Sequence, residues 1–491
     1  MTFKTKPRAH QLAAFNESCD QEYWAWFMDM GTGKTKLTID NMCHLFTEDR
    51  INTGFVLAPK SPLPQWANDS SLETEDTTPK EWDTHGWDGV VSKSRVYMWS
   101  SKKTKRNLAR QKEFLRPFQG FTLFCMNTEA MSTKAGFEYT KKFLSVQGRH
   151  TLTAVDEASM FKNVKAKRTK NLMTLRDLTA YRRVLTGTPV TNGPMNVYGP
   201  LTFLSQSIFG SGYYPFRARY AVLQEMTVAN KTFKVVVGYR RMEELKGIVA
   251  KYSTRVEIND CTDLPAKVYM RRDVELGQEQ AALYQQMKQF AVAELEGKIL
   301  TAPLAITQMM RLRQILCGFF KDEEGGVHPI EDSKRVALIM EALEEINGKV
   351  IILSPFRCPA FAISAAIEKE YGKDRVSTYV GGTKDRDAVK ERFNDPSSGV
   401  DYLVCTGATV KYGVNIKAAY MLWVAPDPDL DIRLQGEARC YGINRGIEGQ
   451  STVYIDFVAP GTIEEKIYTA LRNKKKIADL ITGDKWREFL G

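Results

Sequence analysis

The sequence has few of the residues that build metal sites. Its eight cysteines stand singly along the chain, none forms a Cys-x-x-Cys pair, and only five histidines accompany them. Because a structural zinc ion needs clustered thiolate and imidazole ligands, we do not expect a zinc-stabilised fold. Scattered cysteines in a long chain are typical of a reducing compartment, where they serve as small buried apolar residues. The pattern therefore favours a cytoplasmic protein.

Long apolar runs are also missing. No stretch of about 18 apolar residues occurs, so no membrane-spanning helix is expected. The first residues, Met1–Arg8, are basic but are not followed by an apolar segment, which argues against a secretory signal. We find no internal repeat and no low-complexity segment. The sequence therefore predicts globular domains without a membrane partner.

Acidic residues are outnumbered by basic ones. The 491 residues contain 58 Asp and Glu against 69 Lys and Arg, a formal net charge of +11. This excess favours an anionic polymer or surface as partner, although charge balance alone does not identify it. The length allows about three domains of roughly 150 residues.

Short apolar runs alternate with longer amphipathic stretches, the pattern of an α/β protein. The runs that predict buried strands form two sets, one ending near Leu204 and one beginning near Ser333. They are Gly54–Ala58, Phe121–Met126, Leu152–Val155, Arg183–Leu185, Val350–Leu353, Tyr402–Cys405, Met421–Val424 and Thr452–Phe457. Between the sets lie a Gly/Tyr/Pro-rich piece around Phe209–Pro215 and a helical-looking stretch from Glu279 to Gln314. We therefore expect two α/β lobes that flank a helical insertion.

A phosphate-binding loop follows a short aromatic strand at Tyr23–Phe27. Its glycines let the backbone turn tightly so that amide N–H groups face phosphate oxygens, and the helix behind it directs its positive end at the same anion. The expected nucleotide ligands are Gly31, Thr32, Gly33, Lys34 and Thr35. Lys34 would reach the β- and γ-phosphates, and Thr35 would bind Mg²⁺. Met28 stands where the Walker A pattern has its first glycine, and a glycine-containing helix start with a solvated lysine is the alternative.

Two carboxylates end the apolar run Leu152–Val155. Asp156 is placed to hold Mg²⁺ through water, and Glu157 could polarise the attacking water as a general base. A solvated acidic turn is the common alternative for such a pair. Its position downstream of a Walker A lysine favours the catalytic interpretation.

The order of these motifs resembles that of the Swi/Snf-type DNA translocase ATPases of helicase superfamily 2, over nearly the whole chain. Pro7–Gln11 is similar to the adenine-reading segment, with Gln11 in the glutamine position, and Leu185-Thr-Gly-Thr-Pro-Val-Thr-Asn192 matches motif III. The other matching segments are Val56–Trp66, Asp156–Lys170, Phe209–Tyr220, Leu264–Tyr284, Val350–Phe356, Gln435–Arg439 and Asp456–Lys466.

The resemblance implies two RecA-like lobes, which are parallel sheets flanked by helices, with a helical insertion between them. The expected division is an ATP-binding lobe at residues 1–205, a linker and helical insertion at 206–325, a second lobe at 326–480, and a tail at 481–491. It implies ATP and Mg²⁺ between the lobes, with Lys34, Glu157 and Arg439 as catalytic residues. Arg439 would be the arginine finger that senses the γ-phosphate. Lobe opening after hydrolysis would then move the surfaces that hold DNA.

Two positions depart from the family pattern. Gly442 replaces a second arginine of motif VI, and Arg445, three residues on, could substitute for it. Val410 and Lys411 stand where motif V has a glycine pair. These changes leave Lys34, Asp156 and Glu157 untouched, but they leave open a nucleic-acid-binding scaffold with weakened ATPase as an alternative function.

Two basic runs are candidate surfaces for the polymer. The first contains Lys102, Lys103, Lys105, Arg106 and Arg110, and we interpret it as a solvated helix face. The second follows the acidic pair, where the resemblance implies contact with nucleic acid. The candidate nucleic-acid-binding residues are Lys60, Lys165, Lys167, Arg168, Arg357, Thr406 and Lys411. Tryptophans 82, 87 and 99 are interpreted as core residues rather than base-stacking platforms.

The sequence therefore predicts a DNA-stimulated ATPase that translocates along double-stranded DNA. Its DNA partner would be duplex or branched, and the sequence leaves RNA open. A strand-separating helicase is the alternative within the enzyme class, although no obvious separation element is present. The resemblance is to the minimal forms found in bacteria and their viruses, which implies a bacterial or phage-infected cytoplasm.

Overall fold

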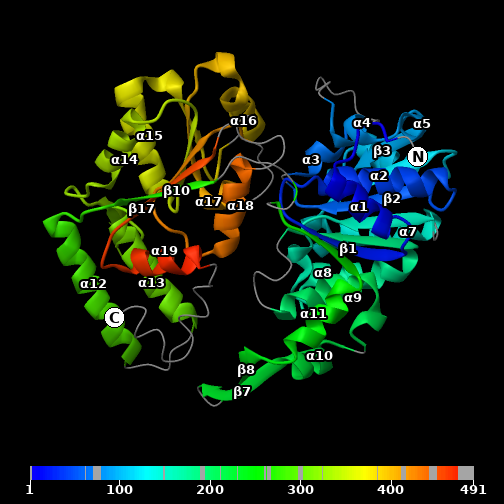
Figure 1. Cartoon of the computed structure of the whole chain (residues 1–491), viewed down its shortest axis with the longest axis horizontal. Coiled ribbons are helices and arrows are strands. Elements are labelled where there is room, and N and C mark those ends of the chain that lie inside the picture. The colour runs from blue at the N-terminus through cyan, green and yellow to red at the C-terminus, as the bar shows by residue number, and fades with distance from the viewer. Residues whose placement is uncertain are drawn as a thin grey trace. The chain divides into compact units, whose positions relative to one another are not determined.

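The computed structural model describes most of the chain, in two compact units that span Met1–Asp263 and Leu264–Gly491 (Figure 1). The described residues are 3–60, 62–69, 79–147, 150–187, 194–210, 212–228, 231–258, 261, 267–296, 302–322, 324–383, 385–410, 416–441 and 451–473. Each unit is built around one parallel sheet. The predicted α/β fold with parallel sheets flanked by helices is confirmed.

The sheet of the first unit has the strand order β3-β4-β2-β5-β6-β1-β9, and all of its pairs are parallel. Its strands are β1 (Tyr23–Met28), β2 (Thr53–Ala58), β3 (Ser94–Met98), β4 (Phe121–Asn127), β5 (Thr151–Val155), β6 (Tyr181–Leu185) and β9 (Ser253–Val256). Successive side chains of a strand point to opposite faces of a sheet. Accordingly Ala25 and Phe27 enter one core cluster, whereas Trp24 and Trp26 enter another.

Helices cover both faces of this sheet, which is why strands such as β1, β2 and β4 carry apolar residues on both sides instead of alternating them with polar ones. One core includes residues of α1 (Ala9–Ser18), α2 (Lys34–Thr47), α3 (Leu63–Trp66) and α4 (Glu81–His85), and the opposite one includes residues of α7 (Lys134–Gln147), α8 (Lys167–Leu175), α9 (Tyr198–Leu204) and α11 (Met242–Ala250). The other elements of the unit are α5 (Asp88–Val91), α6 (Lys105–Phe114), α10 (Tyr213–Tyr220) and the hairpin of β7 (Ala221–Val228) and β8 (Lys231–Tyr239).

The second unit has a parallel sheet in the order β10-β17-β16-β13-β15-β14. Its strands are β10 (Val268–Asp273), β13 (Val350–Ser354), β14 (Val376–Tyr379), β15 (Tyr402–Thr406), β16 (Tyr420–Trp423) and β17 (Val453–Val458). Its helices are α12 (Gln278–Glu296), α13 (Ala302–Leu316), α14 (Arg335–Glu344), α15 (Arg357–Tyr371), α16 (Arg386–Asn394), α17 (Gly407–Val410), α18 (Leu430–Cys440) and α19 (Ile463–Arg472). A short antiparallel pair, β11 (Phe319–Lys321) and β12 (Val327–Pro329), leads into α14.

Every predicted buried run coincides with a strand, to within one residue at each end except for β6, which begins at Tyr181, two residues before the predicted Arg183. The helical stretch expected at 279–314 is present as α12 and α13. The boundary between the two units in the sequence falls inside the predicted 206–325 segment. Residues up to 263 belong to the first unit, in which β9 pairs with β1, and the remainder of the segment belongs to the second. The division into two lobes, a linker and a tail stays a prediction.

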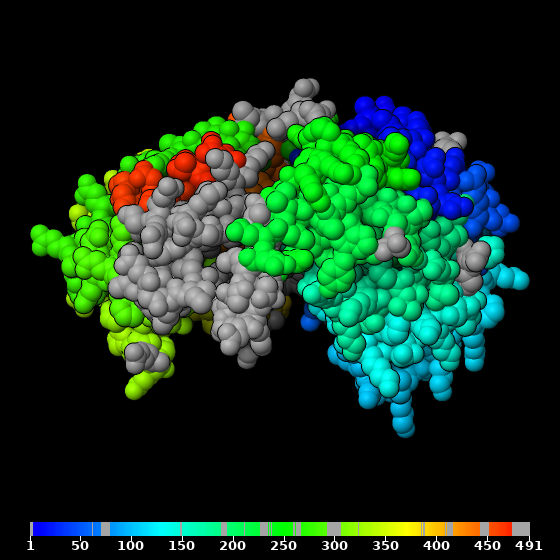
Figure 2. Space-filling model, turned by 90° about the horizontal axis from the view of Figure 1, so that it is seen from below, coloured from blue at the N-terminus to red at the C-terminus, as the bar shows by residue number. Residues whose placement is uncertain are grey.

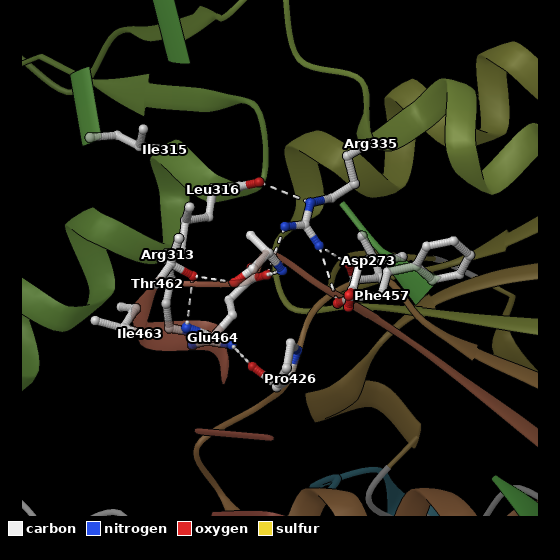
Figure 3. A network of polar contacts seen from close by, with 12 residues as sticks. Asp273, Arg313, Ile315, Leu316, Arg335, Pro426, Phe457, Thr462, Ile463 and Glu464 are labelled. Carbon is white, nitrogen blue, oxygen red and sulfur yellow. Dashed lines mark hydrogen bonds and ion pairs between the residues drawn. The ribbon is translucent and has the colours of Figure 1, made fainter. Parts of the chain in front are cut away.

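A buried guanidinium holds the helices of the second unit against its sheet (Figure 3). Arg335 begins α14, and its Nη2 donates to Glu464 Oε2 on α19 at 2.8 Å. Its Nε donates to the carbonyl of Leu316, at the end of α13, at 2.8 Å, and its Nη1 donates to the carbonyls of Val424 and Phe457 beyond β16 and in β17. Arg335 is 1% exposed and Glu464 is 0% exposed. One ion pair thus joins three helices to two strands.

Glu464→Ala should strongly destabilise the second unit, because it leaves the Arg335 charge buried without its counter-ion. Removing one partner of a buried ion pair costs about 3–5 kcal/mol of unfolding free energy. Urea unfolding followed by circular dichroism measures the loss. The neighbouring Glu465 pairs with Arg271 at 2.9 Å on the surface, where its side chain is 40% exposed, so Glu465→Ala is the matched control. Its cost should stay below about 1 kcal/mol. Equal unfolding midpoints for the two variants would contradict the assignment.

Candidate functional site

The loop between β1 and α2 has the backbone conformation that its glycines predict. Gly31 and Gly33 have φ values of 82° and 85°, a left-handed region that favours glycine. A β-carbon at Gly33 would lie 2.0 Å from Gln11 Nε2, so a side chain there would displace the glutamine. Thr32 is fully buried, and its hydroxyl donates to the Asp29 carbonyl at 2.7 Å. The sequence thus folds into a compact loop directly ahead of the helix N-terminus.

Lys34 is folded back over this loop. Its Nζ donates to the carbonyl oxygens of Met28 at 2.8 Å and Asp29 at 3.0 Å. Thr35, the second residue of α2, is half-buried. The loop therefore brings an ammonium group, a hydroxyl and the N-terminus of a 14-residue helix to one place. Helix N-termini and glycine-rich loops bind phosphate because their amide N–H groups are free of intrahelical acceptors.

Helix α1 is fastened to the same loop. Gln11 Nε2 donates to the Thr32 carbonyl at 3.1 Å, and Gln11 Oε1 accepts from the Arg8 amide at 2.9 Å. His10 Nε2 also lies 2.9 Å from the Thr32 carbonyl oxygen. Gln11 is 6% exposed. Its predicted role as an adenine ligand stays a prediction, and in this conformation its amide ties α1 to the phosphate loop. Nothing in the sequence singled out His10.

The two predicted catalytic carboxylates follow β5. The Asp156 amide donates to the Leu57 carbonyl at 2.7 Å, and the Glu157 amide donates to Asp156 Oδ1 at 2.9 Å. Glu157 has φ 51° and ψ 55°, a left-handed conformation that is rare outside glycine. Such strain costs on the order of 1–3 kcal/mol and gathers at functional sites. Ser159 Oγ donates to Glu157 Oε1 at 2.8 Å, which orients the carboxylate.

Burial makes Asp156 a site for a cation. Loss of hydration, followed by the repulsion of Glu157, raises the pKa of Asp156 to about 6 from its ordinary value of 3.8. The Lys34 ammonium acts in the opposite direction, and so does the Trp66 side chain. The Lys34 ammonium is close enough to lower the pKa of Asp156, so the phosphate loop and the end of β5 lie close together. The loop follows β1, and β6 lies between β1 and β5 in the sheet. A divalent cation would relieve the repulsion between the two carboxylates.

Two further residues support the phosphate loop, and neither was assigned this role from the sequence, although Gly187 lies in the segment that matches motif III. A β-carbon at Gly187, just beyond β6, would lie 3.2 Å from the Met30 amide nitrogen, so a larger residue there would press against the loop. The Asp29 carboxylate accepts from the Ile258 amide at 3.2 Å and lies 3.5 Å from Arg255 Nη2. Asp29 therefore ties the loop to the end of the edge strand β9. Residues 188–192 of motif III lie outside the described residues.

In the second unit the predicted finger, Arg439, lies near the end of α18 and is 3% exposed. On the same helix, Arg433 forms a buried ion pair with Asp456 of β17 and a second one with Glu437 at 2.6 Å. These carboxylates outweigh the burial of Arg433 and raise its pKa. Nothing in the sequence marked Arg433, which fixes α18 to the sheet. Gly442, Arg445 and Lys411 lie outside the described residues.

The predicted nucleic-acid contacts that the structure describes are divided between the two units. Lys165 and Lys167 are exposed at the start of α8, and Arg168 is half-buried. Lys60 is exposed after β2, and Arg357 is exposed at the start of α15. Thr406 is 8% exposed, and its hydroxyl lies 3.3 Å from that of Thr409. Their roles stay predictions.

The first basic run is interrupted by an inward-facing residue. Arg110 is 7% exposed and bonds the carboxylate of Asp69, whereas Lys102, Lys103, Lys105 and Arg106 are exposed. The core interpretation of the nearby tryptophans is confirmed. Two of them, residues 82 and 87, are at most 8% exposed, and the third, residue 99, packs against a core cluster. No helix among the described residues is long and apolar enough to span a membrane.

Comparison with known proteins gives consistent matches. A family model described as the SNF2-related domain matches residues 26–319. Protein CHROMATIN REMODELING 4 of Arabidopsis thaliana is 24% identical over 96% of this chain and 21% of its own length. The putative ATP-dependent helicase/translocase YwqA of Bacillus subtilis is 23% identical over 93% of this chain and 46% of its own. The human DNA repair and recombination protein RAD54-like is 25% identical over 69% and 48%. The chain thus spans less than half the length of each of these relatives.

Among solved structures, the Sulfolobus solfataricus SWI2/SNF2 ATPase core in complex with dsDNA aligns with this chain. The alignment covers 99% of this chain and 97% of that one, at 21% identity and a TM-score of 0.42.

Asp156→Asn should stabilise the metal-free protein more at pH 7 than at pH 4. Because the pKa of Asp156 is raised in the folded state, folding takes up a proton between about pH 4 and pH 6. The wild-type free energy of unfolding therefore falls as pH rises through this window, by up to about 3 kcal/mol. Asparagine does not titrate, so the variant lacks this pH-dependent loss of stability. Thermal unfolding without nucleotide or metal measures the difference. Asp88→Asn, at a side chain that is 83% exposed, is the control. A stability gain independent of pH would contradict the burial of an ionised Asp156.

Proposed function

The chain belongs to the SNF2-related family, and from this premise we propose that it is a DNA-stimulated ATP hydrolase that translocates along double-stranded DNA. The observation that carries the proposal is the pairing of the phosphate loop at Gly31–Lys34 with the half-buried carboxylate of Asp156 and the buried one of Glu157. Both lie at strand ends of one parallel sheet, where α/β folds bind their ligands. A loop for polyphosphate beside this acidic pair fits hydrolysis of a nucleoside triphosphate.

The residues fit ATP with Mg²⁺. Thr35 and Asp156 are the ligands that would hold the metal, whose charge neutralises that developing on the phosphates. Lys34 exchanges its two backbone acceptors for β- and γ-phosphate oxygens. Glu157 orients and deprotonates the attacking water, and Ser159 holds its carboxylate. The backbone strain at Glu157 fits this role, because a strained residue has little freedom to leave its position.

Motion along DNA requires that ATP hydrolysis change the contacts between the protein and the DNA. We assign Arg439 to the γ-phosphate, so that loss of that phosphate would break a contact of the second unit. Opening and closing of the units would then shift their DNA-binding surfaces against one another. The names of the Bacillus subtilis and human relatives, which refer to a helicase/translocase and to DNA repair, support a DNA substrate. A strand-displacement assay distinguishes this motor from a strand-separating helicase.

Lys34→Ala should abolish DNA-stimulated phosphate release, because it removes the charge that neutralises the β- and γ-phosphates. Glu157→Gln should still bind ATP but should hydrolyse it at least about 100-fold more slowly, since an amide cannot accept the proton. Phosphate release with and without duplex DNA, together with fluorescent nucleotide binding, measures both effects. Lys103→Ala, at an exposed lysine of the same unit, is the control. Near-normal turnover in either active-site variant refutes its assigned role.

DNA affinity should fall steeply with salt and depend little on base sequence, because a motor that steps along any sequence must hold the backbone. Replacing Lys165, Lys167 and Arg168 by Gln should reduce the slope of log K against log [salt] by up to about three. Fluorescence anisotropy with two duplexes of unrelated sequence, from 50 to 300 mM salt, is the measurement. A salt-insensitive complex or a strong sequence preference would argue against backbone tracking.

A further inference from the structure

An antiparallel hairpin projects from the first unit. Strands β7 and β8 pair from Ala221↔Tyr239 to Val228↔Lys231 and join no other sheet within the described residues. Figure 1 shows the hairpin extending beyond α10 and α11, which precede and follow it. Leu223 and Val236, near its base, pack against the core of the unit. Isolated two-stranded hairpins are marginal in water, so these contacts at the base help to hold the hairpin in place.

Four arginines surround this base. Arg217 and Arg219 lie on α10, and Arg240 and Arg241 follow β8. We call them the hairpin-base arginines. The segment from α10 to α11, which carries them, belongs to the green part of the first unit in Figure 2. The side chains of Arg219 and Arg241 are 51% and 54% exposed. The backbone reversal at the hairpin thus gathers on one surface four cations that are up to 24 positions apart in the sequence.

Backbone carbonyls hold two of these guanidinium groups in position. Arg217 Nη2 donates to the Lys234 carbonyl at 2.6 Å. Arg240 donates from Nη2 to the Ala218 carbonyl at 2.5 Å and from Nε to the Arg219 carbonyl at 3.2 Å. A guanidinium has five N–H donors and no acceptor, so donors remain for an anion. Because the groups are already oriented, binding would cost less side-chain entropy than it does for a mobile lysine.

Carboxylates at this surface do not balance the positive charge. Glu244 serves two of the arginines, accepting from Arg219 Nε at 2.7 Å and lying 4.0 Å from Arg241 Nη1. Two nearby lysines, 234 and 246, pair with Glu225 and Glu243. Six cations therefore face three carboxylates, an excess of three positive charges. The partner that this surface fits is a polyanion.

Exposed tyrosines lie among these cations. Tyr214, beside the arginines on α10, is 64% exposed, and Tyr239, which ends β8, is 44% exposed. Basic surfaces interleaved with aromatic rings are typical of nucleic-acid-binding proteins. In addition, the major groove of B-DNA is wide enough for a two-stranded β-ribbon. An acidic protein partner would need neither feature.

We propose that the base of the β7–β8 hairpin is a second DNA-contacting surface, at which the hairpin-base arginines bind the phosphate backbone of double-stranded DNA. The inference rests on the proposed function, which supplies DNA as the partner. The surface consists of residues other than those of the run at Lys165–Arg168. Its role is to hold the duplex, with phosphates rather than bases as ligands, so it adds affinity without sequence preference.

The test uses the full chain and compares two variants of equal charge. The hairpin variant carries Arg219→Gln, Arg240→Gln and Arg241→Gln. The control variant carries Lys102→Gln, Lys103→Gln and Arg106→Gln at the other exposed run of the same unit. Binding to a fluorescent 30-base-pair duplex and to one of its single strands is measured from 50 to 300 mM salt without nucleotide. We expect the hairpin variant to lower the salt slope for duplex by up to about three and affinity at least about 10-fold, and the control to leave both unchanged.

Three results would overturn the inference: equal losses in both variants, which would reflect net charge alone; no loss in the hairpin variant; or a loss confined to the single strand. Arg→Lys at the same three positions separates charge from folding, because lysine still binds phosphate as a point charge. It should recover much of the salt slope. If the triple Gln variant unfolds, Arg219→Gln with Arg241→Gln replaces it, since both side chains are half-exposed. Absence of DNA binding by the wild-type chain would instead refute the proposed function, whereas a wild-type chain with DNA-stimulated turnover and an unaffected hairpin variant refutes only this inference.

Discussion

The charge of the Asp156 carboxylate is the constraint on which the candidate site of the first unit depends. Loss of hydration disfavours its charged form, and the repulsion of Glu157 adds to the cost. The Lys34 ammonium acts against this cost, and it is at the same time held by carbonyls of its own loop. In the proposed function, a metal–polyphosphate complex would supply a further cation and give Lys34 stronger acceptors, so binding energy and catalytic geometry would come from the same contacts.

Most of the strands could be predicted from the sequence, because buried parallel strands appear in it as short continuous apolar runs. A strand covered on both faces is mostly apolar, as Phe121–Met126 and Val350–Leu353 are. The β7–β8 hairpin has no such apolar run. Its residues mix charged, polar and apolar types, and their pairing depends on neighbours across the hairpin rather than on burial. The edge strand β9, with partly exposed residues, was missed for the same reason.

The site divides along a similar line. Lys34, Asp156 and Glu157 could be found because their chemistry needs those residue types at those spacings. The supporting roles of His10, Asp29 and Gly187 could not be predicted, because these residues act through tertiary contacts that involve the loop or its backbone. Such contacts join segments more than 20 residues apart and place no demand on local sequence. The left-handed backbone of Glu157 is likewise imposed by the fold, since glutamate has no local preference for it.

The position of the charges matters more than their sum. Several arginines that contribute to the formal charge of +11 are internal: Arg110, Arg183, Arg335 and Arg433 are each at most 7% exposed. They bond carboxylates or backbone carbonyls and stabilise the units, so a polyanion cannot reach them. The positive potential that a polymer would meet comes from surface groups such as those at the start of α8 and the base of the hairpin. Composition can suggest a polyanionic partner. Only the fold distinguishes the buried cations that stabilise the protein from the exposed cations that can bind such a partner.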